Sequence, residues 1–273
     1  LTKKRGDAES FARQISSEAG VQRLEFKNNS SLGTCHSSLL VIAAGGDGTY
    51  NEVINGIACT NIPMAILPLG TTNVLAKELN IPEDVEKAVD IALNGKIHTI
   101  CLGKITNNPP PLLTRYFLLM AGIGYDGETV YGIKKGLKRY SGKGAYILSG
   151  LKTLLRWAPD KLTFTMDGKS CEGYSAIICK TSKYAGNFRI APDADINKNS
   201  LYAFIMHSRN RLDILRYISG ILTKKHLKFK DITYQQAENI EVKGNAHIQI
   251  DGDYFGMTPA RIEIAPDALR LVY

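Results

Sequence analysis

The sequence predicts a doubly wound α/β domain followed by a mostly antiparallel, sandwich-like β domain. In residues 1–97 helical and strand patterns alternate, as in a parallel sheet covered by helices. From residue 98 on, short strands are separated by Gly, Pro, Asn and Asp turns. The 273 residues are 44% hydrophobic, which is enough for two cores. We therefore expect domains at 1–97 and 98–273, with a last strand free to return to the first domain and an active site in the cleft between them.

The first domain is expected to repeat a strand-to-helix unit. The first helix carries Phe11, Ile15 and Ala19 on one face and ends at Gly20. A continuous apolar run at 38–44 is typical of a parallel strand that is buried on both faces. The expected helices are 6–20, 49–57, 74–79 and 83–96, and the expected strands are 38–44 and 64–67.

The second domain is expected to consist of strands with two helical interruptions. The pairs Asp167-Gly168 and Asp251-Gly252 are two-residue hairpin signals. The expected helices are 144–157 and 211–223, and the expected strands lie within 99–105, 115–123, 161–180, 200–207, 239–244, 246–256 and 260–266.

Charge and cysteine content narrow the class of protein. The net charge of +8 and the pI of about 9.1 favour an anionic partner, namely nucleic acid, a membrane surface or a phosphorylated ligand. The five cysteines form no C-x-x-C pair, which argues for reduced thiols and against a disulfide framework or a zinc site. No apolar run reaches the ~18 residues that span a bilayer, and no secretory signal is evident. We therefore expect a cytoplasmic location.

Two glycine-containing loops, GGDGT at 45–49 and PLGTTN at 68–73, follow predicted strands. Ligands bind at the carboxyl ends of such strands, and a following helix N-terminus favours an anion. Neither loop matches a Walker or G-x-G-x-x-G motif, so a plain strand-to-helix turn stays open as the alternative. Asp47 suits a phosphate site if Mg²⁺ lies between the two, or if the acid hydrogen-bonds a hydroxyl. Both arrangements indicate phosphoryl transfer to an alcohol.

Four segments together resemble a known family. GGDGTYNEVINGI, MAILPLGTTNVLAKELNIP, AGIGYDG and IQIDGD occur in the same order as motifs of the diacylglycerol-kinase catalytic-domain family, which includes bacterial lipid kinases and the sphingosine and ceramide kinases. GGDGT alone is shared with NAD kinases, but the set is specific and the resemblance covers nearly the whole chain. It implies an ATP-dependent lipid kinase with the nucleotide on the first domain and Mg²⁺ as a cofactor.

The resemblance also implies roles for individual residues. Asp47 is expected to organise Mg²⁺ and phosphates, Asp126 to lie near the acceptor head group, and Asp253 to act as the general base. The residues expected to bind the nucleotide are Gly45, Gly46, Asp47, Gly48, Thr49, Asn51, Glu52, Thr71 and Asn73.

The chain departs from the family pattern in several places. Asp253 stands where the family usually has Glu, one methylene longer, and Asp251-Gly252 is by itself a good turn. Val74 replaces an aspartate of many relatives. A metal-binding D-G of some members reads APDADINKNSL here; Asp193, Asp195 and Asn197 could substitute for it, but we assign no metal to them. The family's first strand and NP-x-x-G loop are expected to precede Leu1.

Two basic amphipathic segments suggest how a lipid is reached. Residues 129–159 contain seven Lys or Arg and no further acid after Glu128, and residues 209–230 contain seven basic residues and one acid. Such segments suit an anionic leaflet, at about 1 kcal/mol per Lys or Arg. The alternative is that their apolar faces pack on the β domain. Because neither segment interleaves aromatics with basic residues, we do not expect a nucleic-acid partner.

The sequence therefore predicts a kinase that phosphorylates a hydroxyl of a membrane lipid, most simply a diacylglycerol-like one, at the inner face of the membrane. Two other functions stay open. A soluble-substrate kinase of the NAD-kinase type would share GGDGT, and a non-catalytic lipid- or nucleotide-binding module would fit the shortened acid at Asp253.

Overall fold

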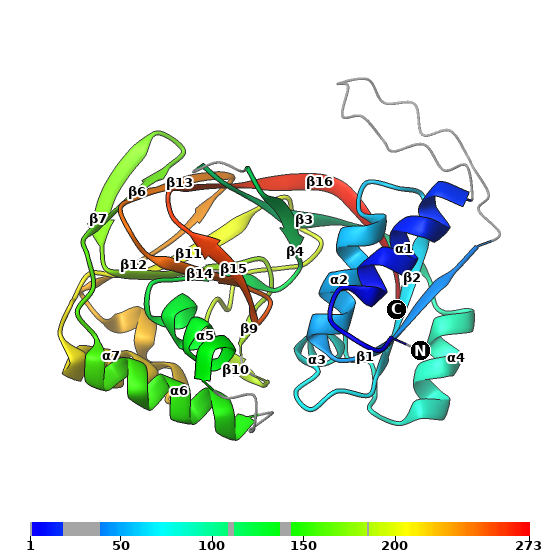
Figure 1. Ribbon diagram of the computed structural model, residues 1–273, viewed down its shortest axis with the longest axis horizontal. Coiled ribbons are helices and arrows are strands. Elements are labelled where there is room, and N and C mark those ends of the chain that lie inside the picture. The colour runs from blue at the N-terminus through cyan, green and yellow to red at the C-terminus, as the bar shows by residue number, and fades with distance from the viewer. Residues whose placement is uncertain (1, 19–38, 109–111, 137–142, 185) are drawn as a thin grey trace. The chain divides into compact units, whose positions relative to one another are not determined.

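A computed structural model describes residues 2–18, 39–108, 112–136, 143–184 and 186–273. The chain forms two compact units, residues 1–102 with 265–273, and residues 103–264. The first unit is a mixed α/β domain and the second an antiparallel β-sandwich, which confirms the predicted fold class (Figure 1). The placement of an active site between the domains stays a prediction.

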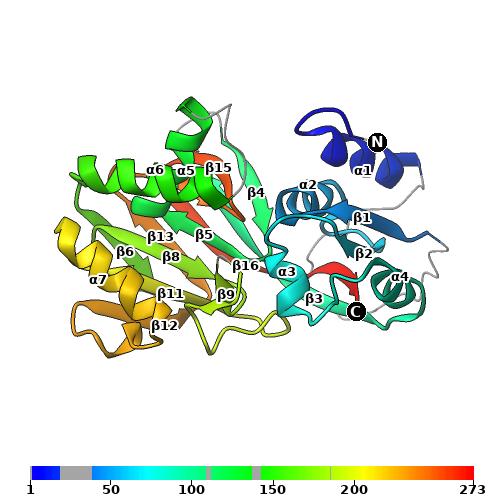
Figure 2. The ribbon, with the colours of Figure 1, turned by 90° about the horizontal axis from the view of Figure 1, so that it is seen from below.

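The first unit contains parallel strands with helices on both sides. β1 (Val41–Gly45) pairs in parallel with β2 (Pro63–Pro68), and β2 pairs in parallel with the last residues of β16 (Ala260–Val272). Helices α1 (Asp7–Glu18) and α2 (Asp47–Ile57) lie on one side of these strands and α4 (Val85–Asn94) on the other (Figures 1 and 2). The short helix α3 (Val74–Glu78) follows the second glycine loop. Helix α2 begins two residues earlier than predicted, because Asp47 and Gly48 belong to its first turn.

The second unit is built from two sheets with a common core. One sheet contains β3 (Ile97–Asn107), β4 (Thr114–Phe117), β16, β13 (Asn239–Lys243), β6 (Leu162–Met166) and β7 (Lys169–Gly173). The other has the order β12 (Ile232–Ala237), β11 (Leu201–Met206), β8 (Ser175–Cys179), β5 (Met120–Ile123), β14 (His247–Ile250) and β15 (Asp253–Met257). A short hairpin joins β9 (Lys183–Tyr184) and β10 (Phe188–Arg189). Fully buried side chains such as Phe117, Phe164, Ile178, Ile205, Ile240 and Ile262 fill the space between the sheets.

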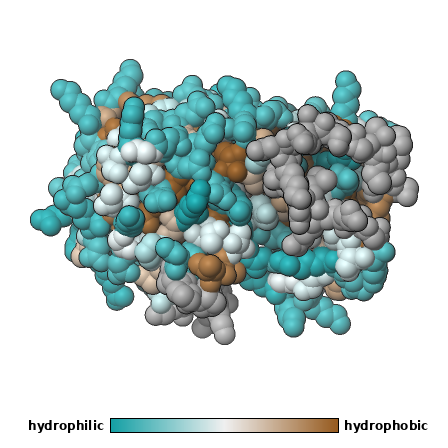
Figure 3. Space-filling model, turned by 90° about the horizontal axis from the view of Figure 1, so that it is seen from above, coloured by the Kyte–Doolittle hydropathy of each residue, from teal (hydrophilic) through white to brown (hydrophobic). Residues whose placement is uncertain are grey.

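The outer faces of the two sheets differ. Along β13 exposed polar residues alternate with buried Ile240 and Val242, as expected of a sheet with one face in water. Figure 3 looks onto the outer face of this sheet, which is mainly hydrophilic there. Helices α5 (Tyr125–Gly136), α6 (Lys143–Arg156) and α7 (Arg211–Leu222) instead cover the outer face of the other sheet (Figure 2). All three helices therefore lie on one side of the sandwich.

Helix α5 was not predicted. Its sequence YDGETVYGIKKG contains internal glycines and no strong apolar period, so local propensity does not favour a helix. Packing accounts for Gly127, since a Cβ at this position would lie only 2.1 Å from the carbonyl oxygen of His247 in β14. Packing against the sheet thus stabilises this helix, although its local sequence does not favour one.

The other predicted features of the second unit are largely confirmed. Asp167, Gly168, Asp251 and Gly252 all have positive φ, as two-residue hairpin turns require. The expected helices at 144–157 and 211–223 form as α6 and α7. Cys59, Cys101, Cys171 and Cys179 are free thiols. Within the described parts of the chain, no helix is long and apolar enough to cross a membrane.

Candidate active site

The first glycine loop leads directly into the N-terminus of α2. Gly46 is the N-cap residue, and the first backbone bond of the helix runs from Tyr50 N to Gly46 O at 3.1 Å. The amides of Asp47, Gly48 and Thr49 therefore lie in the open first turn, where a helix lacks internal acceptors and its dipole favours an anion. These residues are half-buried, so part of their surface is reachable. The loop therefore offers the unpaired backbone N–H donors that a phosphate site requires.

The two glycine loops touch each other. A Cβ on Gly70 would lie 2.5 Å from the Cα of Gly46, so any side chain there would push the loops apart. Leu69 N donates a hydrogen bond to Gly45 O at 2.9 Å. The structure thus brings GGDGT and LGTTN together, and the exposed Thr71 lies on the second of them.

Asp47 holds the second loop by capping α3. Its Oδ2 accepts a hydrogen bond from Val74 N and its Oδ1 from Leu75 N, both at 3.0 Å. A carboxylate at a helix N-terminus both satisfies orphan amides and complements the helix dipole. The acid therefore has a positioning role that the sequence did not reveal, and its expected role in organising Mg²⁺ stays a prediction.

The Asp47 cap gives a first expected result. Asp47→Asn should lower the free energy of unfolding by about 1–2 kcal/mol, because an amide can offer only one acceptor oxygen to the two N–H groups. Hydrogen exchange at the Val74 and Leu75 amides should accelerate in the same variant. Asp90→Asn, on the exposed surface of α4, is the matched control. Unchanged exchange at these two amides would refute the cap.

Tyr50 and Asn73 complete the packing of the loops. The Tyr50 hydroxyl lies 2.8 Å from Gly45 O and 3.0 Å from Leu67 O, and can donate to either carbonyl. Burial, and then the charge of Asp47, raise its pKa, so it stays a donor. Asn73 adopts a left-handed conformation with φ of 49° and donates from Nδ2 to Pro68 O and Gly70 O. Its buried Oδ1 has no hydrogen-bond partner within the described protein, which leaves an acceptor at the centre of the loop.

Asn51 and Glu52 make contacts within the domain. Glu52 accepts hydrogen bonds from Gly6 N at 2.8 Å and Ala8 N at 3.2 Å, and so ties the start of α1 to α2. The buried Asn51 accepts from Asn55 Nδ2 at 3.1 Å. Their expected phosphate contacts stay predictions. The observed hydrogen bonds show that both residues also stabilise the packing of the domain.

A second cluster of predicted residues lies in the β-sandwich unit. Asp126, in the first turn of α5, is 4% exposed. It accepts hydrogen bonds from Tyr184 Oη at 2.8 Å and Gln249 Nε2 at 2.6 Å. Gln249 Oε1 in turn accepts from Gly252 N at 2.7 Å. One hydrogen-bonded network therefore joins the predicted acceptor residue Asp126 to the predicted catalytic hairpin.

The two acids of the DGD hairpin have different environments. Asp251 is buried, and its carboxylate accepts hydrogen bonds from Leu118 N, Leu119 N and Met120 N at 2.8–2.9 Å. Asp253 begins β15 on the other side of the turn and is half-buried, so solvent reaches part of it. Asp251 thus anchors the segment that leads into β5, and the expected role of Asp253 as general base stays a prediction.

Sequence reasoning missed the residues that orient Asp126. Tyr184, Gln249 and Gly122 belong to three different strands or hairpins, and no spacing along the chain links them. A Cβ on Gly122 would lie 2.1 Å from Asp126 Oδ2, so this position has to be glycine. Tyr125, next to Asp126, donates to Gly150 O at 2.9 Å, and burial together with the Asp126 charge raises its pKa to about 12.

The described residues do not form a metal cage. They contain no group of three His, Cys, Asp or Glu side chains that could hold a metal ion. In the 193–198 loop, where the sequence departs from the family pattern, the carbonyls of Asp195, Ile196 and Lys198 accept hydrogen bonds from Lys180 Nζ at 2.8–2.9 Å. An ammonium group therefore already serves as the cation of this loop, and the residues present do not fit a protein-held Mg²⁺ there.

Comparison with known proteins gives the class of protein, a kinase, and its family. A model of the diacylglycerol kinase catalytic domain matches residues 1–105, and a model of the YegS C-terminal NAD kinase beta sandwich-like domain matches residues 120–273. The chain belongs to the diacylglycerol kinase family, which confirms the resemblance. A kinase family implies ATP as the phosphoryl donor.

Named relatives support this assignment, and a solved structure shares the fold. The chain is 34% identical over 227 residues to the diacylglycerol kinase of Bacillus subtilis (strain 168), covering 81% of this chain and 73% of that protein. It is 31% identical over 228 residues to that of Staphylococcus aureus (strain JH9), covering 81% and 70%. A crystal structure of a diacylglycerol kinase from Bacillus anthracis str. Sterne shares the fold with a TM-score of 0.66 at 20% identity, covering 100% of this chain and 83% of that one.

Proposed function

We propose that this chain transfers the γ-phosphoryl group of ATP to a hydroxyl of a membrane lipid, with a diacylglycerol-like acceptor. The observation that carries the proposal is the network that joins Asp126 through Gln249 to the DGD hairpin. Phosphoryl transfer depends mainly on positioning and charge stabilisation, and this network holds two acids on rigid elements. Family membership supports the same reaction class.

ATP is proposed to bind at the joined glycine loops of the first unit. The open amides at the start of α2 would receive the phosphates, and Asp47 would hold LGTTN so that Thr71 can reach the nucleotide. Because the described residues contain no ready cage for Mg²⁺, we infer that the metal enters with the ATP phosphates, as Mg²⁺ usually keeps waters and phosphate ligands.

The acceptor hydroxyl is proposed to lie between Asp126 and Asp253. Asp126, fixed by Tyr184 and Gln249, would accept a hydrogen bond from the acceptor and orient it. Asp253 would take the hydroxyl proton as phosphoryl transfer proceeds, a role worth about 10²–10⁴-fold in rate. The shorter side chain of Asp relative to Glu requires the hydroxyl to come about one methylene closer to β15.

The proposal is tested by offering labelled ATP with either mixed micelles of a diacylglycerol or NAD. Label in the lipid alone is the expected result. Label in NAD would favour a soluble-substrate kinase, and no label in any lipid of a wider panel would favour a non-catalytic binding module. Each of these two outcomes would overturn the proposal.

Helices α6 and α7 are proposed to dock on an anionic membrane. α7 buries Ile214, Tyr217 and Gly220 against the sandwich, so packing on the β domain explains one of its faces. The remaining large apolar residues are exposed, with Leu155 at 72% and Leu212 at 71%. Arg211 Nε donates to Trp157 O at 3.2 Å and thereby links α7 to the end of α6. The exposed apolar residues on the two helices are Leu148, Leu151, Leu155, Leu212, Leu215, Ile218 and Leu222.

Docking by these helices predicts a specific loss. Leu155→Ser combined with Leu212→Ser should weaken co-sedimentation with phosphatidylglycerol-containing vesicles by about tenfold or more, because each inserted leucine contributes about 1.5–3 kcal/mol. Leu93→Ser, at a 65% exposed leucine of α4, is the matched control and should bind like the parent. An equal loss in the control, or no loss in the double variant, would contradict docking by this surface.

A further inference from the structure

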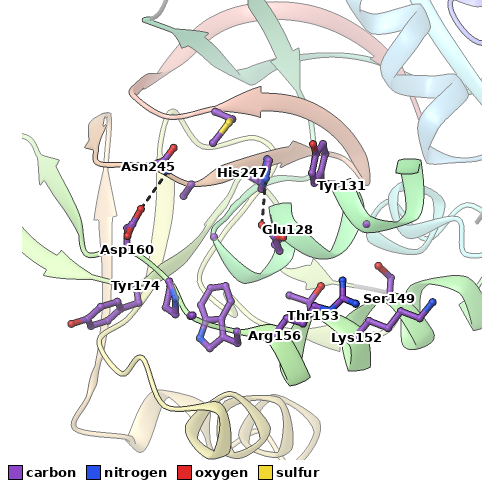
Figure 4. Close-up of a pocket in the computed structure, with 17 residues that line it drawn as sticks. Glu128, Tyr131, Ser149, Lys152, Thr153, Arg156, Asp160, Tyr174, Asn245 and His247 are labelled. Atoms are coloured by element: carbon purple, nitrogen blue, oxygen red, sulfur yellow. Dashed lines mark hydrogen bonds and ion pairs between the residues drawn. The ribbon is translucent and has the colours of Figure 1, made fainter. Parts of the chain in front are cut away.

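The β-sandwich unit contains a cavity of about 590 Å³ that the proposed reaction does not use (Figure 4). Its walls come from α5, α6 with the residues that follow it, and the start of β14. The volume is well above that of a free ion and within the usual range of small-molecule pockets.

Neither of the proposed acceptor acids, Asp126 and Asp253, lines this cavity. Glu128 lines the cavity and lies two residues from Asp126 on α5, which places the two side chains about 200° apart around the helix. On the hairpin, Tyr254 reaches the cavity residue His247, with Oη 3.0 Å from Nδ1. Tyr254 and Asp253 are adjacent in β15 and point to opposite faces. Gln249, which donates to Asp126, is the cross-strand partner of Tyr254, so the cavity adjoins the Asp126–Gln249 pair on one face of the hairpin. Asp253 faces the other way, and neither acid is among the residues that line the cavity.

Of the charged side chains that line the cavity, the two acids contact a neighbouring side chain, whereas the two bases form no ion pair within the described residues. Glu128 Oε2 lies 3.4 Å from His247 Nε2, and Asp160 Oδ2 accepts a hydrogen bond from Asn245 Nδ2 at 3.4 Å (Figure 4). Lys152 and Arg156 lie one turn apart on the α6 wall, and neither forms an ion pair with any residue that the structure describes. Two like charges at this spacing repel each other, so the α6 wall of the cavity favours an anion between them, away from Glu128 and Asp160 on the other walls.

The other residues that line the cavity suit a polar group that is covalently attached to the anion. Tyr131 stacks on His247 with ring centroids 4.0 Å apart, and this pair faces the cavity together with hydrogen-bonding groups of Asn245 and Asp160. The same helix that supplies Lys152 and Arg156 also carries the exposed Leu151 and Leu155. The cationic wall therefore borders the surface that we propose to meet the membrane, and the choice of a lipid ligand rests on that proposed docking.

We propose that this cavity is a second ligand site, separate from the acceptor site, which binds the phosphate ester of a glycerol-containing head group such as that of phosphatidylglycerol. Lys152 and Arg156 hold the phosphate, and the polar groups on the other walls receive the glycerol hydroxyls. Occupation of the site would brace α5 and the β14–β15 hairpin, which carry Asp126 and Asp253.

The single tryptophan of the chain, Trp157, lines the cavity and reports on its occupation. Short-chain phosphatidylglycerol, glycerol 3-phosphate and short-chain phosphatidylcholine are titrated into the full chain without ATP, and tryptophan fluorescence is followed. A saturable change is expected with phosphatidylglycerol and not with phosphatidylcholine. The double variant Lys152→Gln/Arg156→Gln should bind phosphatidylglycerol at least about tenfold more weakly.

A matched control removes the same charge elsewhere. Lys87→Gln/Lys96→Gln alters two exposed lysines that lie outside the cavity and outside both basic segments, and should leave the affinity within about twofold. An equal loss in both double variants, or no saturable fluorescence change, overturns the proposal. Ala158→Phe, which adds bulk at the cavity lining without changing charge, should block binding as the charge variant does.

The separate probes distinguish the source of the ligand. Tighter binding of phosphatidylglycerol than of glycerol 3-phosphate assigns the site to a lipid head group, and equal binding supports the same site with a free phosphate ester. Because no ATP or turnover is involved, a chain that binds phosphatidylglycerol here but phosphorylates no lipid refutes the proposed function alone. A chain that phosphorylates lipid without saturable binding here refutes this inference alone.

Discussion

Replacing Asp253 by Ala should lower the rate of ATP-dependent lipid phosphorylation by about 10²–10⁴-fold while the protein stays folded. The side chain is half-buried at the start of β15, and it follows a turn whose shape is set by the positive φ angles of Asp251 and Gly252. The turn is therefore set by residues other than Asp253, and we expect the variant to fold. The measurement is initial-rate transfer of labelled phosphate to diacylglycerol in micelles, with circular dichroism to confirm folding.

Two conservative changes sharpen this test. Asp253→Asn keeps the size of the side chain but cannot accept the proton, and should be nearly as inactive as the Ala variant. Asp253→Glu restores the longer acid of the family pattern and should retain most of the activity. Parent-like turnover by Asp253→Asn would rule out Asp253 as the base.

The neighbouring acid should behave in the opposite way. Asp251→Ala leaves the amides of Leu118, Leu119 and Met120 without their carboxylate, and should cost about 3–5 kcal/mol of unfolding free energy. Loss of activity in this variant would follow from loss of folding. The contrast between two acids that are separated by one glycine distinguishes a catalytic from a structural role.

Replacing Lys180 by Met should be among the most destabilising single changes, at about 2–4 kcal/mol. Lys180 is 0% exposed, and its ammonium donates to the carbonyls of Asp195, Ile196 and Lys198. Methionine has a similar length but no donor, so it would remove three hydrogen bonds and leave the buried Ile196 carbonyl without the ammonium. Chemical denaturation of parent and variant gives the difference in unfolding free energy.

A surface lysine provides the control for this change. Lys169→Met lies on β7 at an exposed position and should alter stability by no more than about 0.5 kcal/mol. If Lys180→Met were as stable as the control, the ammonium would not be the cation that holds the 195–198 loop. Added Mg²⁺ should not raise the unfolding midpoint of the parent through this loop, because the ammonium already occupies it.

Local sequence signals predicted much of the fold because its loops and hairpins are locally encoded. The apolar run before Gly45 gave β1, and Asp251-Gly252 gave the hairpin turn. Helix α5 could not be predicted, because the reason for a glycine at 127 is its close packing against His247, which is distant in the sequence. For the same reason the hydrogen bonds of Tyr184 and Gln249 to Asp126 could not be predicted, because these residues come together only in the folded sandwich.

Asp47 shows why a motif does not fix a mechanism. The pattern correctly placed it in a glycine loop, but its bonds to Val74 N and Leu75 N depend on the position of the second loop. The acid among the glycines of this loop therefore has a physical role before any metal is invoked, which is to hold the second loop against the first.

The most direct test of the central claim is transfer of label from γ-labelled ATP to a diacylglycerol in mixed micelles by the parent chain and its Asp253→Asn variant. We predict a labelled lipid product with the parent and at most about 1% of that rate with the variant. No labelled lipid from the parent, or equal rates from both proteins, would contradict the account.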